Sequence, residues 1–195
     1  MSAAGHSAYR REGASTLIEV ELRDPRQLFH TLDPSPFRER DLDAQAEAYL
    51  LEAARELHLA SDARLVIHLP AEVMARDETR SIPEAVRHYF DYRAEECDRQ
   101  LRKLLRAGAV SLGIGLLFLL GCLSARRLLM PLPDGDLEQI LGEGLLIIGW
   151  VALWRPLEIF LYDWWPVWRH GRELRWLASR PVELRPGIRV SGSQA

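Results

Sequence analysis

The sequence predicts an α+β head followed by a long stalk helix and a two-helix transmembrane hairpin, so that the protein is mainly α-helical overall. Three observations lead to this prediction. Residues 16–80 alternate short strand patterns with a helical pattern, residues 81–106 read as an amphipathic helix without a breaker, and two apolar stretches of membrane length follow at 107–125 and 137–163. The predicted head is a small cytoplasmic α/β domain, βαβ-like, with two strands.

Charge divides the chain into two unlike halves. Residues 1–98 carry 12 arginines against 20 acidic residues, a net charge of −8, whereas residues 99–195 carry 13 basic residues against 8 acidic ones, a net charge of +5. An acidic head argues against nucleic-acid binding, and the basic half has a simpler explanation in lipid head groups. Lys103 is the only lysine among 25 basic residues, a skew that suggests a GC-rich bacterial genome.

The head begins with a polar segment and a strand. Residues 1–15 lack the apolar core of a signal peptide, and we expect them to be disordered. Alternation from Leu17 to Leu22 predicts a half-buried strand. Asp24 followed by Pro25 predicts a short capped helical turn.

A helix and a second strand complete the predicted head. Apolar spacing predicts a helix over residues 42–59, with Asp41 or Asp43 as its N-cap. The apolar run 63–70 predicts a more buried strand that ends at Pro70. This order is typical of a parallel βαβ unit. Because two strands make a marginal sheet, we expect the head to lean on the following helix or on a second copy of itself.

The head lacks the motifs of known catalytic chemistry. It has no glycine-rich phosphate loop, no HExxH, no CxxC and no GxSxG, and its histidines lack metal-ligand spacing. We therefore predict a protein that is not an enzyme and holds no metal or cofactor. The candidate interaction site of the head is the loop 33–43, where Arg38, Arg40 and Asp41 suggest either an anion-binding pair or a structured turn that leads into the next helix.

One packing face runs along the predicted helix from the stalk into the first span. Apolar residues of the stalk recur at spacings of three and four, close to a coiled-coil seam, and small residues continue the face within the span. Helices in lipid associate through small residues that allow close backbone approach. The partner of this face is the second span, the head or a second subunit, and the sequence does not choose among them. The face consists of Cys97, Leu101, Leu104, Gly108, Ser111 and Gly115.

The first span, 107–125, holds 19 residues without a charge. This length is enough to cross the ~30 Å hydrocarbon core of a bilayer. A buried helix of a large soluble domain is a poor alternative, because no other part of the chain is able to cover it. Cys97 and Cys122 lie about 37 Å apart on one predicted helix at 1.5 Å per residue, which excludes an intrachain disulfide.

The second span, 137–163, carries charges inside an apolar stretch. Arg155 and Glu158 are three residues apart, so they can pair on one helix face, and Pro156 between them removes a helix hydrogen bond. Charges at such depth are costly and are usually paired or face a cavity. Arg155 and Glu158 are therefore a candidate intramembrane polar site, used for proton or ligand passage or, more simply, as a structural pair at a helix kink.

Flanking residues predict the orientation in the membrane. Basic residues precede the first span and follow the second, whereas the turn 126–136 holds two arginines opposed by two aspartates. We expect a bacterial inner-membrane protein with a periplasmic turn and both termini in the cytoplasm. All six tryptophans lie between Trp150 and Trp176, as in an aromatic belt. The segment 164–195 is expected to be a basic interfacial segment followed by a disordered tail.

Two segments resemble a family of uncharacterised bacterial two-span membrane proteins. They are LDPSPFRERDLD at 32–43 and EGLLIIGWVALWRP at 143–156. The resemblance covers residues 16 to about 178 and implies the same arrangement of a head and a hairpin. It implies no activity.

Three functions remain open on the sequence alone. The leading expectation is a non-enzymatic membrane protein, embedded in the lipid bilayer, whose head and stalk bind an unknown membrane or cytoplasmic protein or form a homo-oligomer. The first alternative is an oligomeric channel or carrier subunit that uses Arg155 and Glu158. The second is a membrane-bound enzyme that uses the loop 33–43.

Overall fold

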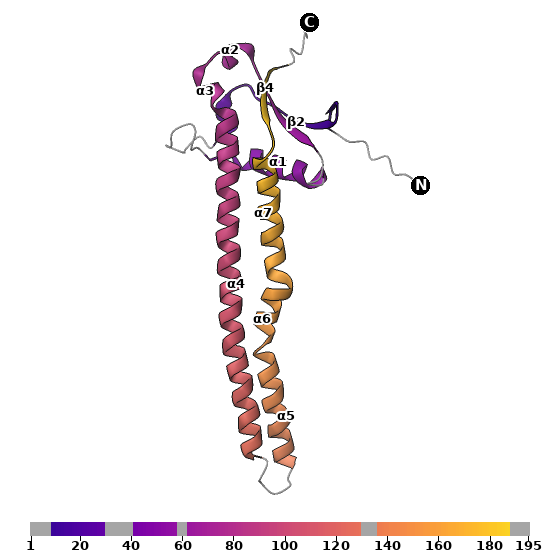
Figure 1. Ribbon diagram of the computed structural model, residues 1–195, viewed down its shortest axis with the longest axis vertical. Helices are drawn as coiled ribbons and strands as arrows, with labels where there is room; N and C mark the ends of the chain where they lie inside the picture. Colours follow the sequence, from indigo (N-terminus) through magenta and orange to yellow (C-terminus); the bar gives the residue numbers. More distant parts are fainter. Residues whose placement is uncertain (1–8, 30–40, 58–61, 130–135, 188–195) are drawn as a thin grey trace, which may run out of the picture. The chain divides into compact units, whose positions relative to one another are not determined.

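The chain forms two compact units (Figure 1). The sheet unit combines Met1–Glu95 with Gly171–Ala195, and the helical unit is Glu96–His170. The helices α4 (Ile82–Leu129) and α7 (Trp164–Ala178) contribute residues to both units. Within these units, the computed structural model describes residues 9–29, 41–57, 62–129 and 136–187.

In the described part of the chain, four strands form one mixed sheet in the order β1-β2-β3-β4. β1 runs antiparallel to β2, whereas β2, β3 and β4 are mutually parallel neighbours. The predicted parallel pairing of two central strands is confirmed. The predicted number of two strands is wrong, because one further strand pairs on each side. The strands are β1 (Arg11–Glu12), β2 (Ser15–Glu21), β3 (Ala63–Leu69) and β4 (Val182–Pro186).

The first added strand, β1, belongs to a tight hairpin with β2. Glu12 pairs with Ser15, so only two residues form the connection. One of them, Gly13, has a φ of 64°, and two-residue hairpin turns need this left-handed conformation, which glycine adopts without steric cost. The prediction of disorder is therefore wrong for the described residues from Tyr9 onward, and residues 1–8 lie outside the described chain.

The second added strand, β4, comes from the C-terminal segment. Val182 pairs with Leu65 and Pro186 with Leu69, so β4 covers an edge of the buried strand β3. On the preceding helix, Leu174 has no exposed surface and Leu177 is buried. The prediction of disorder beyond residue 184 is therefore wrong for the described residues up to Gly187. Leu174 and Leu177, predicted to lie along the membrane surface, are instead buried in the sheet unit.

Short helices of the sheet unit begin at the predicted caps. Asp24 accepts a hydrogen bond from the backbone N–H of Arg26 at 2.8 Å, and Asp43 accepts one from Gln45 at 2.9 Å. The capped turn and one of the two proposed N-caps are thus confirmed. The elements are η1 (Pro25–Gln27), α1 (Ala44–Glu56), α2 (Ala71–Met74) and α3 (Asp77–Arg80).

Ion pairs join α1 to the two longer helices of the sheet unit. Arg93 on α4 lies 3.2 Å from the Oε1 atom of Glu47, and Arg55 donates from Nε to Oε2 of Glu173 on α7 at 2.9 Å. The Glu173 side chain is only 4% exposed, and a buried carboxylate needs such a partner. The head thus leans on the following helix, as expected, and on the C-terminal helix as well.

The helical unit contains one continuous helix and one interrupted helix (Figure 1). α4 has 48 residues without a break, so the predicted continuity from the stalk into the first apolar stretch is confirmed. Within the described chain, neither of its two cysteines forms a disulfide. The predicted second helix is instead divided into α5 (Asp136–Val151), α6 (Trp154–Glu158), the π-helix η3 (Ile159–Asp163) and the start of α7.

Two helical stretches, Ile82–Leu128 and Gly142–Ala178, are long and apolar enough to cross a membrane. In the most apolar 18-residue part of each stretch, only 17% of the part is buried within the protein.

A set of ion pairs on the sheet suggests how stability depends on pH. Glu183 on β4 accepts hydrogen bonds from Arg185 at 2.8 Å and from Arg64 on β3 at 3.1 Å. Arg185 also donates to Glu12 on β1 at 2.7 Å. The hydrogen bond from Arg185, followed by that from Arg64, holds the pKa of Glu183 below its usual range.

We predict that Glu183→Gln reduces stability at neutral pH and that this difference shrinks on acidification. Because the pKa of Glu183 is lower in the folded state, its contribution is present above the pKa of an unfolded glutamate, about 4.3, and is lost as the pH falls below it. Denaturant unfolding of the sheet unit within the full chain, at pH 7 and at pH 3.5, measures the loss of stability and its decrease on acidification. Glu72→Gln, at an exposed position, is the control, and an equal effect of the two substitutions at both pH values would contradict this role.

Candidate functional site

Three charged side chains meet around the end of α6. Arg155 donates from Nη1 to Oε2 of Glu158 at 2.9 Å and lies 3.3 Å from Oδ2 of Asp163. Arg155 and Glu158 therefore form the ion pair that their spacing predicts, whereas the sequence reasoning missed Asp163. We call these three residues the charge cluster.

The change of helix type explains why Asp163 joins the charge cluster. In a regular α-helix, positions 155 and 163 are about 80° apart around the axis. The π-helix η3 lies between Glu158 and Trp164, and its i→i+5 hydrogen bonds widen the turn. The wider turn brings Asp163 back toward the side of Arg155. A separation of eight residues gives no signal for an ion pair, so the sequence alone did not indicate it.

Pro156 explains the interruption between α5 and α6. It has no N–H to donate to the carbonyl of Ala152, four residues earlier, and its ring crowds that carbonyl. The chain leaves α-helical geometry at this point, and Leu153 donates instead to the carbonyl of Trp150, three residues back, at 3.0 Å. The proline thus produces the predicted break, one turn before its own position.

The charge cluster has one guanidinium and two carboxylates. Arg155 is the most exposed of the three, with 63% of its side chain accessible. The adjacent Trp164 donates from Nε1 to the carbonyl of Phe160 at 2.8 Å and packs edge-on against Trp165. The cluster is thus an exposed, hydrogen-bonded polar spot beside an aromatic group, and its chemistry suits charge compensation at a helix break.

The predicted packing face meets the interrupted helix within the helical unit. Gly108 and Gly115 are buried, and a Cβ added at Gly108 would lie 2.8 Å from Cγ2 of Ile159. From the other side, a Cβ at Gly149 would lie 2.6 Å from Cδ1 of Leu119. The sequence left three possible partners for this packing face. At these glycines, the partner in the structure is the second, interrupted helix. Along the rest of the face, Cys97 is buried, and Leu101, Leu104 and Ser111 are partly exposed.

Among these glycines, Gly115 comes nearest to a backbone atom of the facing helix, at the helix break. A Cβ at Gly115 would lie 2.9 Å from the carbonyl oxygen of Ala152 and 2.9 Å from Cδ2 of Leu153. This is the carbonyl that Pro156 leaves without its helical donor. The Cα–H of glycine therefore faces a carbonyl oxygen at short range, a contact that recurs where helices pack closely.

The loop predicted as an interaction site is only partly described. Arg38 and Arg40 lie outside the described residues. Asp41 is described and exposed, and it precedes Leu42, which forms an isolated bridge with Phe29. The proposed role of this loop stays a prediction.

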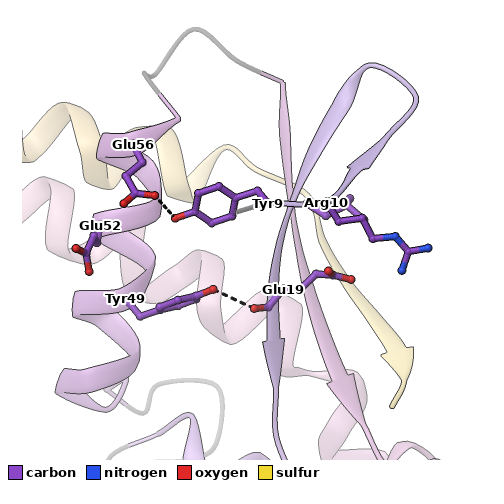
Figure 2. Close-up of a pocket in the computed structure, with 7 residues that line it drawn as sticks. Tyr9, Arg10, Glu19, Tyr49, Glu52 and Glu56 are labelled. Atoms are coloured by element: carbon purple, nitrogen blue, oxygen red, sulfur yellow. Dashed lines mark hydrogen bonds between the residues drawn. The ribbon is translucent and has the colours of Figure 1, made fainter. Parts of the chain in front are cut away.

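A recess in the sheet unit was not predicted (Figure 2). Its volume is about 370 Å³. Tyr9 donates from its hydroxyl to Oε2 of Glu56 at 2.7 Å, and Tyr49 donates to the backbone carbonyl of Glu19 at 3.2 Å. We call it the acidic recess, and it is lined by Tyr9, Arg10, Leu17, Glu19, Tyr49, Glu52 and Glu56.

The acidic recess favours positive charge. Burial, and then the hydrogen bond to Glu56, raise the pKa of the Tyr9 phenol far above its usual value, and burial also raises the pKa of Tyr49. Both phenols thus stay neutral at physiological pH beside three carboxylates. The guanidinium of Arg10 extends away from Glu52 and Glu56 (Figure 2). The Glu19 carboxylate extends to the same side as Arg10 and pairs with Nε2 of His68 at 3.1 Å. No sequence pattern indicated this recess, because Tyr9 lies 47 residues from its partner Glu56.

Among the described residues, no group of three or more His, Cys, Asp or Glu side chains is arranged to hold a metal ion. We therefore assign no described residue to a metal.

Comparisons with known proteins find no family model, no curated protein and no solved structure that matches this chain. The resemblance to a two-span membrane family stays a prediction.

We predict that Gly149→Cys forms a disulfide with the native Cys122. A Cβ at position 149 would lie 3.6 Å from Cβ of Cys122, within the range of about 3.5–4.5 Å found in disulfides. The end of the flexible Leu119 side chain has to rotate away. Mild oxidation of a Cys97→Ser background, followed by mass spectrometry of linked peptides, detects the bond.

Gly144→Cys provides the matched control for this disulfide. A Cβ at Gly144 would meet nothing within 4 Å, so this cysteine should give no intramolecular link. If Gly149→Cys also gives no link, the pairing of α4 with α5 at this height is wrong.

Proposed function

We propose that this protein is an integral membrane protein whose helical unit spans the bilayer twice and whose sheet unit is a non-enzymatic binding module at the membrane surface. The observation that carries the proposal is the low burial of the two apolar stretches. Only 17% of the most apolar part of each is buried, whereas a core helix of a soluble protein is mostly buried. A lipid environment would cover this apolar surface.

The exposed side chains of the helical unit support this environment. Both helices present large apolar groups to their surroundings, and such continuous patches are rare on monomeric soluble proteins. They include Val110, Ile114, Leu117 and Leu120 on α4, and Ile147, Ile148, Trp150 and Val151 on α5.

The contacts between the two helices are also typical of helices that pack in a bilayer. Gly108, Gly115 and Gly149 mark points of close backbone approach, and small residues are enriched where helices associate in lipid. Trp164 and Trp165 follow directly after Asp163, and tryptophans favour the boundary between lipid and water. We propose that the charge cluster lies just inside this boundary and that Arg155 reaches toward the head groups as a structural pair at the break.

Basic residues provide the orientation that we propose. Arginines and a lysine flank the two outer ends of the apolar stretches, and such residues are retained on the cytoplasmic side. The sheet unit and both termini would then lie in the cytoplasm of a bacterial inner membrane, with the turn after α4 in the periplasm.

The acidic recess is the surface that we propose for a partner. The carboxylates of Glu52 and Glu56 and two neutral phenols line it. The Tyr9 and Tyr49 hydroxyls are already engaged by Glu56 and by the Glu19 carbonyl. A positively charged side chain would find both carboxylates and aromatic faces there. We therefore propose that the module binds a basic segment of a partner protein.

We predict that the chain stays in the membrane fraction after an alkaline carbonate wash and that its turn end is accessible from outside. In a Cys97→Ser, Cys122→Ser background, Leu128→Cys should react with a membrane-impermeant maleimide in intact cells. Leu128 is 84% exposed. Glu72→Cys, in the sheet unit, should react only after permeabilisation. Release of the protein into the carbonate supernatant would contradict the membrane proposal.

We predict that Glu52→Gln with Glu56→Gln weakens binding of a fluorescent hexa-arginine peptide to the full chain about threefold to tenfold, because exposed ion pairs are each worth roughly 0.2–1 kcal/mol. Fluorescence anisotropy at low and high salt measures the effect, which should shrink with salt. Glu72→Gln with Glu78→Gln removes the same charge elsewhere on the sheet unit. Equal weakening by both double substitutions would show that the recess is not the binding surface.

A further inference from the structure

A groove with two arginines lies in the helical unit, near the C-terminal end of α4. Its volume is about 460 Å³. Among the side chains that the structure describes, which exclude those of residues 136–139 and 141, neither guanidinium has a hydrogen-bond or ion-pair partner. We call it the arginine groove, and it is lined by Leu120, Leu123, Ser124, Arg126 and Arg127.

A glycine on the facing helix positions one of the arginines. A Cβ added at Gly142 on α5 would lie 3.5 Å from Nε of Arg126 and 3.8 Å from its Cγ. The Arg126 side chain therefore lies across α5 where that helix has no side chain. This placement holds the guanidinium between the two helices.

The groove offers donors for an anion and apolar surface beside them. Ser124 donates its hydroxyl to the carbonyl of Leu120 at 2.8 Å, so the donors for a ligand come from the two guanidiniums, each with five N–H groups. No carboxylate lines the groove among the described residues. Planar guanidiniums match the geometry of a phosphate.

The order of residues along α4 matches the depth profile of a phospholipid. Leu120 and Arg126 are about 9 Å apart along the helix axis at 1.5 Å per residue. In the proposed membrane orientation, the leucines lie at the depth of acyl chains and the arginines at the depth of head-group phosphates. We infer that the arginine groove binds an anionic phospholipid, with its phosphate on Arg126 and Arg127 and an acyl chain against the leucines.

This inference rests on the proposed membrane insertion and adds a ligand preference to it. Among the described side chains that line the groove, the two guanidiniums are the only charged groups. A lipid head group with a net negative charge is attracted, whereas a zwitterionic head group brings its own cationic amine to the same place. Inorganic phosphate shares the anionic chemistry but has no acyl chain to cover Leu120 and Leu123.

Native mass spectrometry of the full chain in detergent tests the inference with three probes, namely phosphatidylglycerol, phosphatidylethanolamine and inorganic phosphate. We expect saturable binding of phosphatidylglycerol and at least tenfold weaker binding of the other two. Arg126→Ala with Arg127→Ala should weaken phosphatidylglycerol binding on the order of 30-fold, since each arginine near an anionic lipid surface contributes roughly fivefold. Gly142→Leu should also weaken it, because a side chain there displaces Arg126.

Arg102→Ala with Arg106→Ala is the matched control, since it removes two exposed arginines that precede the same apolar stretch. It should leave phosphatidylglycerol binding within about twofold of the wild-type value, well short of the effect expected at the groove. Unchanged binding by the Arg126, Arg127 variant, or equal binding of phosphatidylethanolamine, would overturn the inference. Equally tight binding of inorganic phosphate would assign the groove to a soluble anion and overturn it too. Failure of the membrane proposal itself would appear separately, as release of the chain by carbonate.

Discussion

The carbonyl of Ala152 sets the geometry of the helical unit. Pro156 removes its helical donor, and Gly115 on α4 leaves room for the oxygen, which would lie 2.9 Å from a Cβ at that position. The glycine allows the two helices to approach each other at the break. The contact therefore combines a proline on one helix with a glycine on the other, and a larger residue at position 115 would separate the helices.

Other features of the helical unit follow from this break. The helix resumes as α6 and passes into the π-helix η3, whose wide turn brings Asp163 to Arg155. Closer to the turn, Gly149 and Gly142 keep the two helices close, and Gly142 lets Arg126 lie across α5. The proposed lipid groove and the charge cluster thus depend on the same close helix pairing, although they lie at different heights of the unit.

Local signals allowed much of the fold to be predicted. Alternation indicated β2, and an apolar run that ends at Pro70 indicated β3. Apolar helical spacing with an N-cap indicated α1, and the lack of a breaker indicated the continuous α4. Features that depend on distant pairing were missed. Val182 of β4 pairs with Leu65 of β3, and Tyr9 contacts Glu56 in the acidic recess. The ion pair between Arg155 and Asp163 depends on the π-helix η3. Periodicity and capping describe neighbours along the chain, so they carry no information about such contacts.

Paired alanine substitutions at Gly115 and Gly113 test the central claim most directly. Gly115 faces the Ala152 carbonyl, whereas a Cβ at Gly113 would meet nothing within 4 Å. The free energy of unfolding of the helix pair, measured in lipid bicelles by steric trapping, should fall by about 1–3 kcal/mol for Gly115→Ala because of overpacking. For Gly113→Ala it should stay the same or rise by up to about 1 kcal/mol through helix propensity. Equal effects of the two substitutions would contradict the account.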